Sequence, residues 1–530
     1  TTVNLILIDF KGGATFLDLA RAPHTTAVVT NLDEEAHLVE RMREALTGEI
    51  DRRERLLRAA GILSAADLPE LPTLFIIVDE FSEMLSRHPE FADVFVAIGR
   101  LGRSLGMHLL LASQRLEEGR LRGLDSHLSY RICLKTLSET ESRMVLGVPD
   151  AHHLPARPGA AYLKAAAAEP VPFRAGYVSA PVPSRPRTPA GPRLFTGHET
   201  SGADAAGPTL LHTVLDVVAH AWSADGPAPH PVWLAPLTET PALAALLPGS
   251  PAGVLRIPVG MVDRVYEHRR DPLVIDLSGA DGNVAIVGGP RSGKSTAART
   301  VVTALAATQS PRRARVYCLD FGGALTDLAA LPHVGVVAPG TDADLVRRTV
   351  TDLLGVLRRR EAGDGSAEAD GAVFLVVDGW GSARRDYREF QELESALGIL
   401  GGGLAHGVHL VVTAGRWADI RPALRDQLGT RIELRLGDPA DSEIDRARAA
   451  AVPRDRPGHG LSPEGLPMVM ARPGARHREE IDGWRVPPVR LLPALLDYRD
   501  LLADAGTGAG PVVGLDEDRL EPVGLDLADQ

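Results

Sequence analysis

The chain has 530 residues, of which 44% are hydrophobic and 24% charged, and its 57 Lys and Arg against 69 Asp and Glu give a formal net charge of −12. At roughly 150 residues per domain, this length allows about two to four globular domains, and the composition excludes a disordered, collagen-like or coiled-coil chain. The acidic balance disfavours a protein whose whole surface binds nucleic-acid phosphates, although a local basic groove is compatible with it.

Cysteine usage and hydropathy indicate the compartment. The two cysteines, Cys133 and Cys318, stand in apolar strand-like runs far apart in sequence, which favours a reducing compartment. No run of about 18 apolar residues is free of charge and proline, so the sequence predicts no transmembrane segment. We therefore expect a soluble globular chain with no export signal.

The first predicted elements are short hydrophobic strands whose ends carry polar residues. FIIVD ends at Asp79 with Glu80 after it, and GMHLLLASQR ends with Ser113, Gln114 and Arg115. Charged helical stretches alternate with these strands, a pattern that predicts a parallel sheet flanked by helices.

The stretch that follows is rich in proline and is expected to link two domains. Residues 178–193, VSAPVPSRPRTPAGPR, are typical of an extended linker. Residues 209–222 have the periodicity of an amphipathic helix, and VWLAPL at 232–237 has the composition of a strand. We expect this segment to pack on a domain.

The landmarks of the first part recur about 300 residues later in the same order. Five pairs correspond: LILIDFKGG with YCLDFGG, FIIVD with FLVVD, GMHLLLASQR with GVHLVVTAGR, SYRICL with GTRIEL, and Arg-Pro-Gly at 157–159 with 456–458. The sequence therefore predicts two copies of one domain. The expected boundaries are a first module at 1–177, a linker and packing segment at 178–255, a second module at 256–475, and a linker and lead-in to a third module at 476–530.

The ends of the two copies do not match. Asp320 follows Lys294 by 26 positions, whereas only eight residues precede the equivalent Asp9, so the first copy lacks its P-loop. The tail at 511–527 resembles residues 257–277, which lead into the second copy. These features predict that the chain is a segment of a longer tandem, or that residues are missing from it.

A phosphate-binding P-loop follows the strand NVAIVG of the second copy. Its glycines let successive backbone N–H groups point at phosphate oxygens, and the helix that follows adds its positive dipole end. Lys294, one of only four lysines, is predicted to bridge the β- and γ-phosphates of ATP, and Ser295 to bind Mg²⁺. The predicted nucleotide-binding residues are Gly288, Gly289, Pro290, Arg291, Ser292, Gly293, Lys294, Ser295, Thr296, Asp378 and Arg416.

The two copies differ at the predicted catalytic positions. Asp378 ends the strand FLVVD and is predicted to hold Mg²⁺, as Asp79 does in the first copy. Glu80 follows Asp79 and is placed to polarise the attacking water, whereas Gly379 stands there in the second copy. The loss of a general base costs about 10² to 10⁴ in rate. We therefore expect the second site to bind ATP and to hydrolyse it slowly.

Other polar residues are weaker candidates. Gln114 is predicted to sense the γ-phosphate or only to cap a loop, and the second copy has Gly415 instead. Surface ion pairing is the default expectation for each candidate arginine, although one of them is a candidate finger for a neighbouring subunit. His152 and His153 lack ligands at metal spacing and are expected to be loop or core residues. The candidate arginines are Arg103, Arg115, Arg131, Arg416 and Arg431.

Longer motifs resemble a known family. DFKGGATF at 9–16, IVDEFSEML at 77–85, and residues 98–132 and 145–150 resemble the first ATPase module of the EccC family, the FtsK/SpoIIIE-type ATPases of type VII (ESX) secretion. Residues 287–296, 318–335, 376–380 and 415–443 resemble its second module.

The resemblance implies an α/β fold of tandem RecA-like P-loop NTPase modules that use ATP and Mg²⁺. It implies the cytoplasmic portion of a membrane-associated complex, with hexamer formation, other type VII membrane components as partners, and export of WXG100-type substrates. In that family the first module is the competent hydrolase and later modules are degenerate. Two alternatives remain open: an FtsK-like DNA translocase, which the acidic charge disfavours, and a non-hydrolysing ATP-binding module that regulates or docks substrates.

Overall fold

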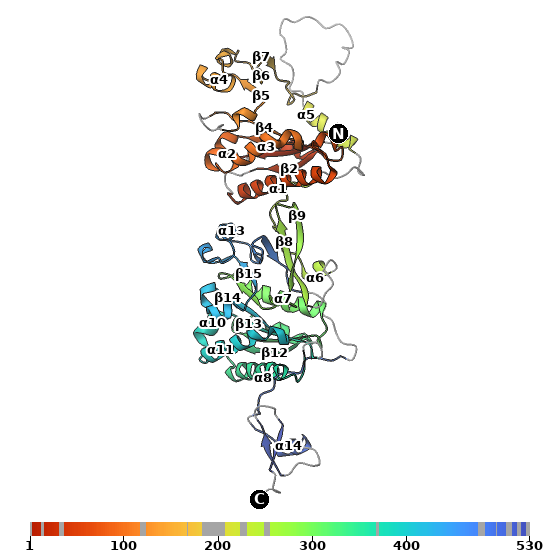
Figure 1. The fold of residues 1–530 in the computed structure, drawn as a ribbon, viewed down its shortest axis with the longest axis vertical. Helices are drawn as coiled ribbons and strands as arrows, with labels where there is room; N and C mark the ends of the chain where they lie inside the picture. The colour runs from red at the N-terminus through yellow and green to blue at the C-terminus, as the bar shows by residue number, and fades with distance from the viewer. Residues whose placement is uncertain are drawn as a thin grey trace, which may run out of the picture. The chain divides into compact units, whose positions relative to one another are not determined.

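The fold consists of two compact α/β units, seen in a computed structural model of the chain (Figure 1). The first unit comprises Thr1–Ala235 together with Val265–Arg269, and the second comprises Pro236–Arg264 and Arg270–Gln530. The structure describes residues 3–11, 15–30, 36–116, 123–166, 168–182, 207–222, 230–247, 255–366, 370–474, 483–493, 495–504, 511–516 and 521–525. Most of the predicted linker at 178–193 lies outside these residues.

The first unit contains two sheets. Four parallel strands form one in the order β2-β1-β3-β4, and three antiparallel strands form the other in the order β5-β6-β7. Its strands are β1 (Val3–Asp9), β2 (Thr25–Val29), β3 (Thr73–Asp79), β4 (Met107–Leu111), β5 (Tyr130–Leu134), β6 (Ala160–Ala165) and β7 (Val171–Arg174). Its helices are α1 (Ala36–Ala60), α2 (Phe81–Arg87), α3 (Phe91–Leu105), α4 (Glu139–Leu146) and α5 (Leu210–Ala221).

The second unit is built on one sheet of ten strands, in the order β12-β11-β13-β14-β10-β15-β16-β17-β8-β9. The first six are parallel, and antiparallel pairing begins at β16. These strands are β8 (Arg256–Arg264), β9 (Arg269–Asp276), β10 (Val284–Val287), β11 (Ala314–Asp320), β12 (Val334–Pro339), β13 (Ala372–Asp378), β14 (Val408–Ala414), β15 (Thr430–Leu434), β16 (His459–Leu461) and β17 (Pro467–Met470). The predicted parallel sheet is confirmed for the part that carries the P-loop.

Helices and a small hairpin complete the second unit. The helices are α6 (Leu243–Leu246), α7 (Lys294–Thr308), α8 (Ala343–Glu361), α10 (Trp380–Asp386), α11 (Phe390–Gly401), α12 (Pro422–Arg425), α13 (Arg446–Ala450) and α14 (Tyr498–Asp504). In the tail, β18 (Val512–Leu515) pairs antiparallel with β19 (Pro522–Gly524).

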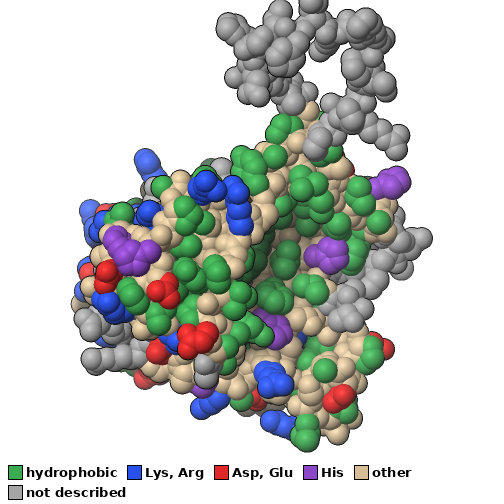
Figure 2. All heavy atoms as spheres, turned by 90° about the horizontal axis from the view of Figure 1, so that it is seen from above, with side chains coloured by type: hydrophobic (Ala, Val, Ile, Leu, Met, Phe, Trp, Pro, Cys, Tyr) green, Lys and Arg blue, Asp and Glu red, His purple; other side chains and the backbone are tan. Residues whose placement is uncertain are grey.

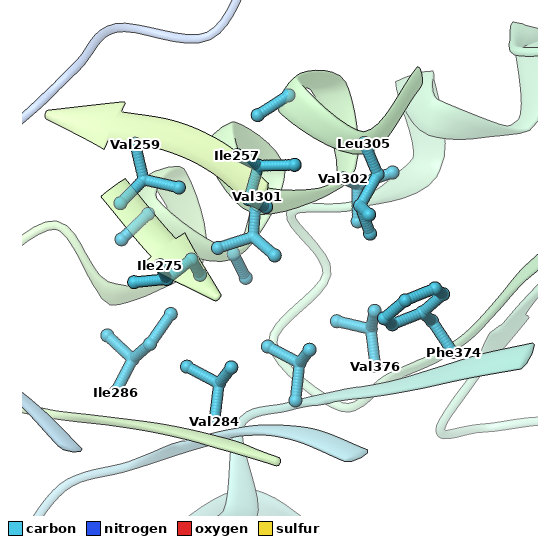
Figure 3. Packing of buried hydrophobic residues seen from close by; sticks show 14 of the residues in the cluster. Ile257, Val259, Ile275, Val284, Ile286, Val301, Val302, Leu305, Phe374 and Val376 are labelled. Atoms are coloured by element: carbon cyan, nitrogen blue, oxygen red, sulfur yellow. The ribbon is translucent and has the colours of Figure 1, made fainter. Parts of the chain in front are cut away.

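A hydrophobic core holds the P-loop helix of the second unit on its sheet. Val301, Val302 and Leu305 of α7 are fully buried in one cluster with Val284 and Ile286 of β10 (Figure 3). At about 25 cal/mol per Å² of buried apolar surface, such side chains each contribute roughly 1.5–3 kcal/mol. Packing therefore fixes the strand and the helix on both sides of the loop.

The corresponding region of the first unit is arranged differently. In the second unit β10 lies between β14 and β15, whereas their counterparts β4 and β5 belong to separate sheets in the described part of the first unit. Tyr130, Ile132 and Leu134 of β5 are 55–71% exposed. Figure 2, viewed from above Figure 1, shows hydrophobic side chains gathered around a hollow. The exposed apolar side chains of β5 form an edge that a further strand and helix would cover.

Two expectations for the segment after the first copy had different outcomes. The predicted helix is confirmed as α5, which lies on the first unit, where His212 contacts Asp18. The predicted strand at 232–237 is wrong, because these residues have no strand pairing. The carbonyl of Leu234 instead accepts hydrogen bonds from Arg41 Nε and Nη2, at 2.9 and 2.6 Å.

Membrane spans are not seen among the described helices. None of them combines the length and the apolar character that crossing a bilayer requires. Cys133 and Cys318 are both buried, and neither forms a disulfide.

Candidate functional site

The P-loop sequence forms the turn between β10 and α7. All four residues of β10 are buried, and α7 begins at Lys294. Gly293 at the helix N-terminus has φ 100°, and Arg291 has φ 57°. The left-handed conformation at Gly293 suits a residue without Cβ. Residues 288–296 therefore lie at a strand-to-helix bend, as the sequence predicts.

Neighbouring backbone holds this loop in place. The N–H of Gly288 donates to the carbonyl of Ala414 at 3.1 Å, and the N–H of Gly289 donates to that of Arg435 at 2.8 Å. A Cβ on Gly289 would lie 2.9 Å from the nitrogen of Gly437. The glycine is thus required by close packing of main chain against main chain. Pro290, Arg291 and Thr296, also predicted in the loop, are exposed.

Two side chains inside the loop suit a phosphate. Ser292 is 2% exposed, and its Oγ has no hydrogen-bond partner within the described part of the chain. Lys294 Nζ donates to the carbonyl of Gly289 at 2.8 Å, and burial lowers the pKa of this lysine below its usual 10.5. An orphaned buried hydroxyl and a partly desolvated ammonium both gain from an anion. The first turn of α7 contains no acidic residue, so its N–H groups and positive dipole end favour the same ligand.

Asp378 lies beside the loop and is held by two hydroxyls. Ser295 Oγ donates to its Oδ2 at 2.8 Å, and Thr413 Oγ1 donates to its Oδ1 at 2.6 Å. Asp378 is 1% exposed, and this burial raises the pKa of its carboxyl, whereas the two hydrogen bonds lower it. A hydroxyl and a carboxylate in contact at the end of a P-loop fit Mg²⁺, which prefers oxygen ligands.

Sequence reasoning missed Thr413. Besides binding Asp378, its Oγ1 accepts a hydrogen bond from the N–H of Gly379 at 2.8 Å. Ala112 occupies the equivalent position in the first copy, so comparison of the two copies would have singled out this residue.

Asp320, the neighbour of Asp378 across the sheet, has a structural role. Its two carboxylate oxygens accept hydrogen bonds from the N–H groups of Gly323, Ala324 and Leu325, at 2.7–3.1 Å. The loop after β11 therefore closes on the end of its own strand.

Gly379 stands where the first copy has Glu80. It has φ 86°, and a Cβ there would lie 2.9 Å from the nitrogen of Gly322. Gly322 is equally restricted, because its own Cβ would lie 2.4 Å from Asp378 Oδ2. The second copy has therefore closed the space into which a side chain at either position would extend.

The first copy keeps a carboxylate at this place. Glu80 has φ 57° at the N-terminus of α2 and is 6% exposed, and its N–H donates to Asp79 Oδ1 at 3.0 Å. Lys11, which corresponds to Gly322, lies 3.8 Å from Glu80 and 2.8 Å from Glu83. The first copy thus provides Asp79, a nearly buried Glu80 and a cation at the ends of adjacent strands.

The polar tip after β4 lies near this carboxylate. The N–H of Gln114 is 3.5 Å from Glu80 Oε2, while the Gln114 side chain is exposed. Ser113 Oγ donates to the carbonyl of Arg115, whose side chain is exposed. Gln114 therefore approaches Glu80 with its backbone N–H and not with its side chain.

The candidate arginines have different surroundings. Arg416 is 64% exposed and lies 3.6 Å from Asp419. Arg131 forms an ion pair with Asp125 at 2.9 Å, and Arg431 forms one with Glu443 at 3.2 Å. Arg103 is exposed. Ion pairing, the default expectation, holds for these three pairs.

A family profile and two curated proteins match this chain. The profile of the FtsK/SpoIIIE family matches residues 1–118 and 256–476. ESX-4 secretion system protein EccC4 of Mycobacterium tuberculosis is 51% identical, over 99% of this chain and 46% of that protein. ESX secretion system protein EccC of Thermomonospora curvata is 44% identical, over 99% of this chain and 46% of that protein.

A solved structure extends the likeness to the fold. The cytoplasmic domain of the Thermomonospora curvata type VII secretion ATPase EccC superposes with a TM-score of 0.83 and 42% identity, over 100% of this chain and 66% of that one. The chain spans less than half the length of the two curated relatives.

Proposed function

The chain belongs to the FtsK/SpoIIIE family, and from this premise we propose that it is the ATP-binding part of a motor that drives protein export. The observation that carries the proposal is the arrangement in the second unit, where Lys294 and Ser295 begin α7 beside the buried Asp378. A strand, a glycine turn and a helix in this geometry bind the phosphates of a nucleotide.

Each residue of the second site has a distinct task in this proposal. Lys294 releases the Gly289 carbonyl and pairs with the β- and γ-phosphates, and the hydroxyl of Ser292 gains an acceptor. Ser295 and Asp378 hold Mg²⁺, which neutralises charge on the phosphates when it is bound. Thr413 keeps the Asp378 carboxylate oriented.

The two copies divide binding and hydrolysis between them. The first copy has Glu80 to orient the attacking water, whereas in the second a Cβ at Gly379 would lie 2.9 Å from the nitrogen of Gly322, so a carboxylate there is disfavoured. We propose that the second unit retains ATP and hydrolyses it slowly, since the loss of a general base costs about 10² to 10⁴ in rate.

The first copy needs a P-loop to use its catalytic residues. The apolar, exposed β5 and the separation of β4 from β5 favour a strand and helix that fit there as β10 and α7 fit in the second unit. We propose that a strand and helix of this kind complete the first site.

The names of the relatives support the biological setting. EccC4 and EccC are secretion system proteins by name. By extension we propose the cytoplasmic side of a type VII secretion complex, hexamer formation, association with its membrane components, and WXG100-type proteins as exported substrates.

Turnover measurements test the division of labour. The purified chain should retain ATP with little hydrolysis, and Glu80→Gln should not alter that rate. In a longer protein that supplies the first P-loop, the same substitution should reduce hydrolysis by about 10² to 10⁴. Rapid turnover by the chain, unaffected by Glu80→Gln, would contradict the proposal.

A static ATP-binding role is the second candidate, and Gly379 favours it. Tight ATP retention with no stimulation by any exported protein would support that role over a motor. A strongly salt-dependent affinity for duplex DNA would instead support a DNA translocase.

A further inference from the structure

A cluster of metal-ligating side chains lies in the first unit, away from the nucleotide residues. Glu49 of α1, His230 and His268 each place one ligand atom within 4.8 Å of the others. His230 Nε2 lies 3.1 Å from His268 Nδ1, and Glu49 Oε2 lies 3.8 Å from the former and 3.7 Å from the latter. Glu49 is fully buried, His268 is 1% exposed and His230 is 31% exposed.

The spacing of these three atoms fits a metal ion. The point equidistant from atoms separated by 3.1, 3.7 and 3.8 Å lies about 2.1 Å from each of them, which is the usual Zn–N and Zn–O bond length. We propose that Glu49, His230 and His268 form a binding site for a divalent transition-metal ion of the zinc type. Two histidines and one glutamate also occur together at zinc sites that keep a fourth position for water.

The surrounding hydrogen bonds orient the ligands. His268 Nε2 lies 2.8 Å from the carbonyl of Ala45, so this nitrogen carries the proton and Nδ1 presents its lone pair to the cluster. Such outer hydrogen bonds are usual for metal-bound histidines. Burial lowers the pKa of His230 to about 4 and also lowers that of His268.

Two arginines contact the carboxylate of Glu49 and affect the affinity of the site for a cation. Arg52 Nε lies 2.7 Å from Glu49 Oε2, and Arg53 Nε lies 2.7 Å from Oε1. The guanidinium of Arg53 also donates to the carbonyls of Leu105 and Pro72, both at 2.8 Å. The arginines fix the carboxylate, and their charge weakens the attraction for a cation, so the site depends on its two neutral imidazoles.

A glycine on α1 allows the backbone of the turn at 265–269 to come close to this helix. A Cβ on Gly48 would lie 1.9 Å from the carbonyl oxygen of Tyr266, so only glycine lets the turn at 265–269 approach α1. Glycine within a helix costs about 1 kcal/mol relative to alanine. This cost falls at Gly48, the residue next to Glu49, where the absence of a Cβ allows the three ligands to come together.

Zinc titration of the purified chain against a chromophoric chelator tests the proposal. We expect His230→Gln to weaken binding at one site by at least about tenfold, because even an outer-shell change costs about 10- to 100-fold. His153→Gln, which removes a histidine that is 64% exposed, is the matched control and should leave that site unchanged. Equal affinity and stoichiometry in the wild type and His230→Gln would overturn the proposal.

A second measurement needs no variant. His230 is exposed enough to react with diethyl pyrocarbonate, and Zn²⁺ should protect it in the wild-type chain, whereas Mg²⁺, which prefers oxygen ligands, should not. Co²⁺ should give the visible absorption of a site with nitrogen ligands. Unchanged labelling of His230 in saturating Zn²⁺ would show that its ring does not bind the metal, and would refute the site.

Discussion

Restoring a carboxylate to the second copy with Gly379→Glu is expected to fail as a repair. The residue has φ 86°, and the new Cβ would lie 2.9 Å from the nitrogen of Gly322 and 3.1 Å from the carbonyl carbon of Phe321. Both neighbours are main-chain atoms, which cannot rotate away as a side chain can.

The energetic cost of this substitution has two parts. A left-handed conformation costs a residue with Cβ roughly 1–2 kcal/mol, and overpacking costs roughly 1–3 kcal/mol. The sum is about 2–5 kcal/mol of unfolding free energy, which lowers the Tm of a unit of this size by roughly 4–20 °C.

Thermal unfolding and ATP turnover measure both consequences. Gly379→Ala carries the same Cβ without the carboxylate, so it should lose nearly the same Tm and separates strain from chemistry. We expect Gly379→Glu to raise ATP turnover by less than about a hundredfold. A second difference would remain, because Gly415 stands where the first copy has Gln114. A larger gain, or a variant as stable as the wild type, would refute this reasoning.

Two further substitutions probe the buried carboxylate. Asp378→Asn should raise the Tm at neutral pH and weaken Mg-ATP binding. Because burial raises the pKa of Asp378 above 3.8, the folded state binds this proton more tightly than the unfolded state, and stability falls as pH rises through that range. Thermal unfolding should show this fall in the wild type and less of it in the variant; parallel profiles would contradict the assignment. Thr413→Ala should cost about 1–3 kcal/mol, since it leaves the N–H of Gly379 without its acceptor. Denaturant unfolding should show Thr413→Ser close to the wild type, and an equal loss in both would show that the hydroxyl is not responsible.

Local patterns in the sequence were sufficient to predict the P-loop. The strand, the glycines and Lys294 follow one another along the chain, so a short motif specifies the bend that the structure shows at 288–296. The repeat likewise placed Asp378 and Asp79 at equivalent strand ends, where the structure has them.

Features that depend on distant residues were not predicted. The strand expected at 232–237 does not form, and the Leu234 carbonyl accepts hydrogen bonds from Arg41 instead. The cluster of Glu49, His230 and His268 has no spacing signature, since its members come together only through packing on α1. The antiparallel half of the second sheet also brings together strands from both ends of the copy.

Calorimetric titration of Mg-ATP into the purified chain tests the central claim most directly. We expect one ATP per chain, with binding abolished in Lys294→Ala although this variant still unfolds cooperatively. Absence of binding in the wild type, or undiminished binding in folded Lys294→Ala, would contradict the assignment of the second unit as the nucleotide site.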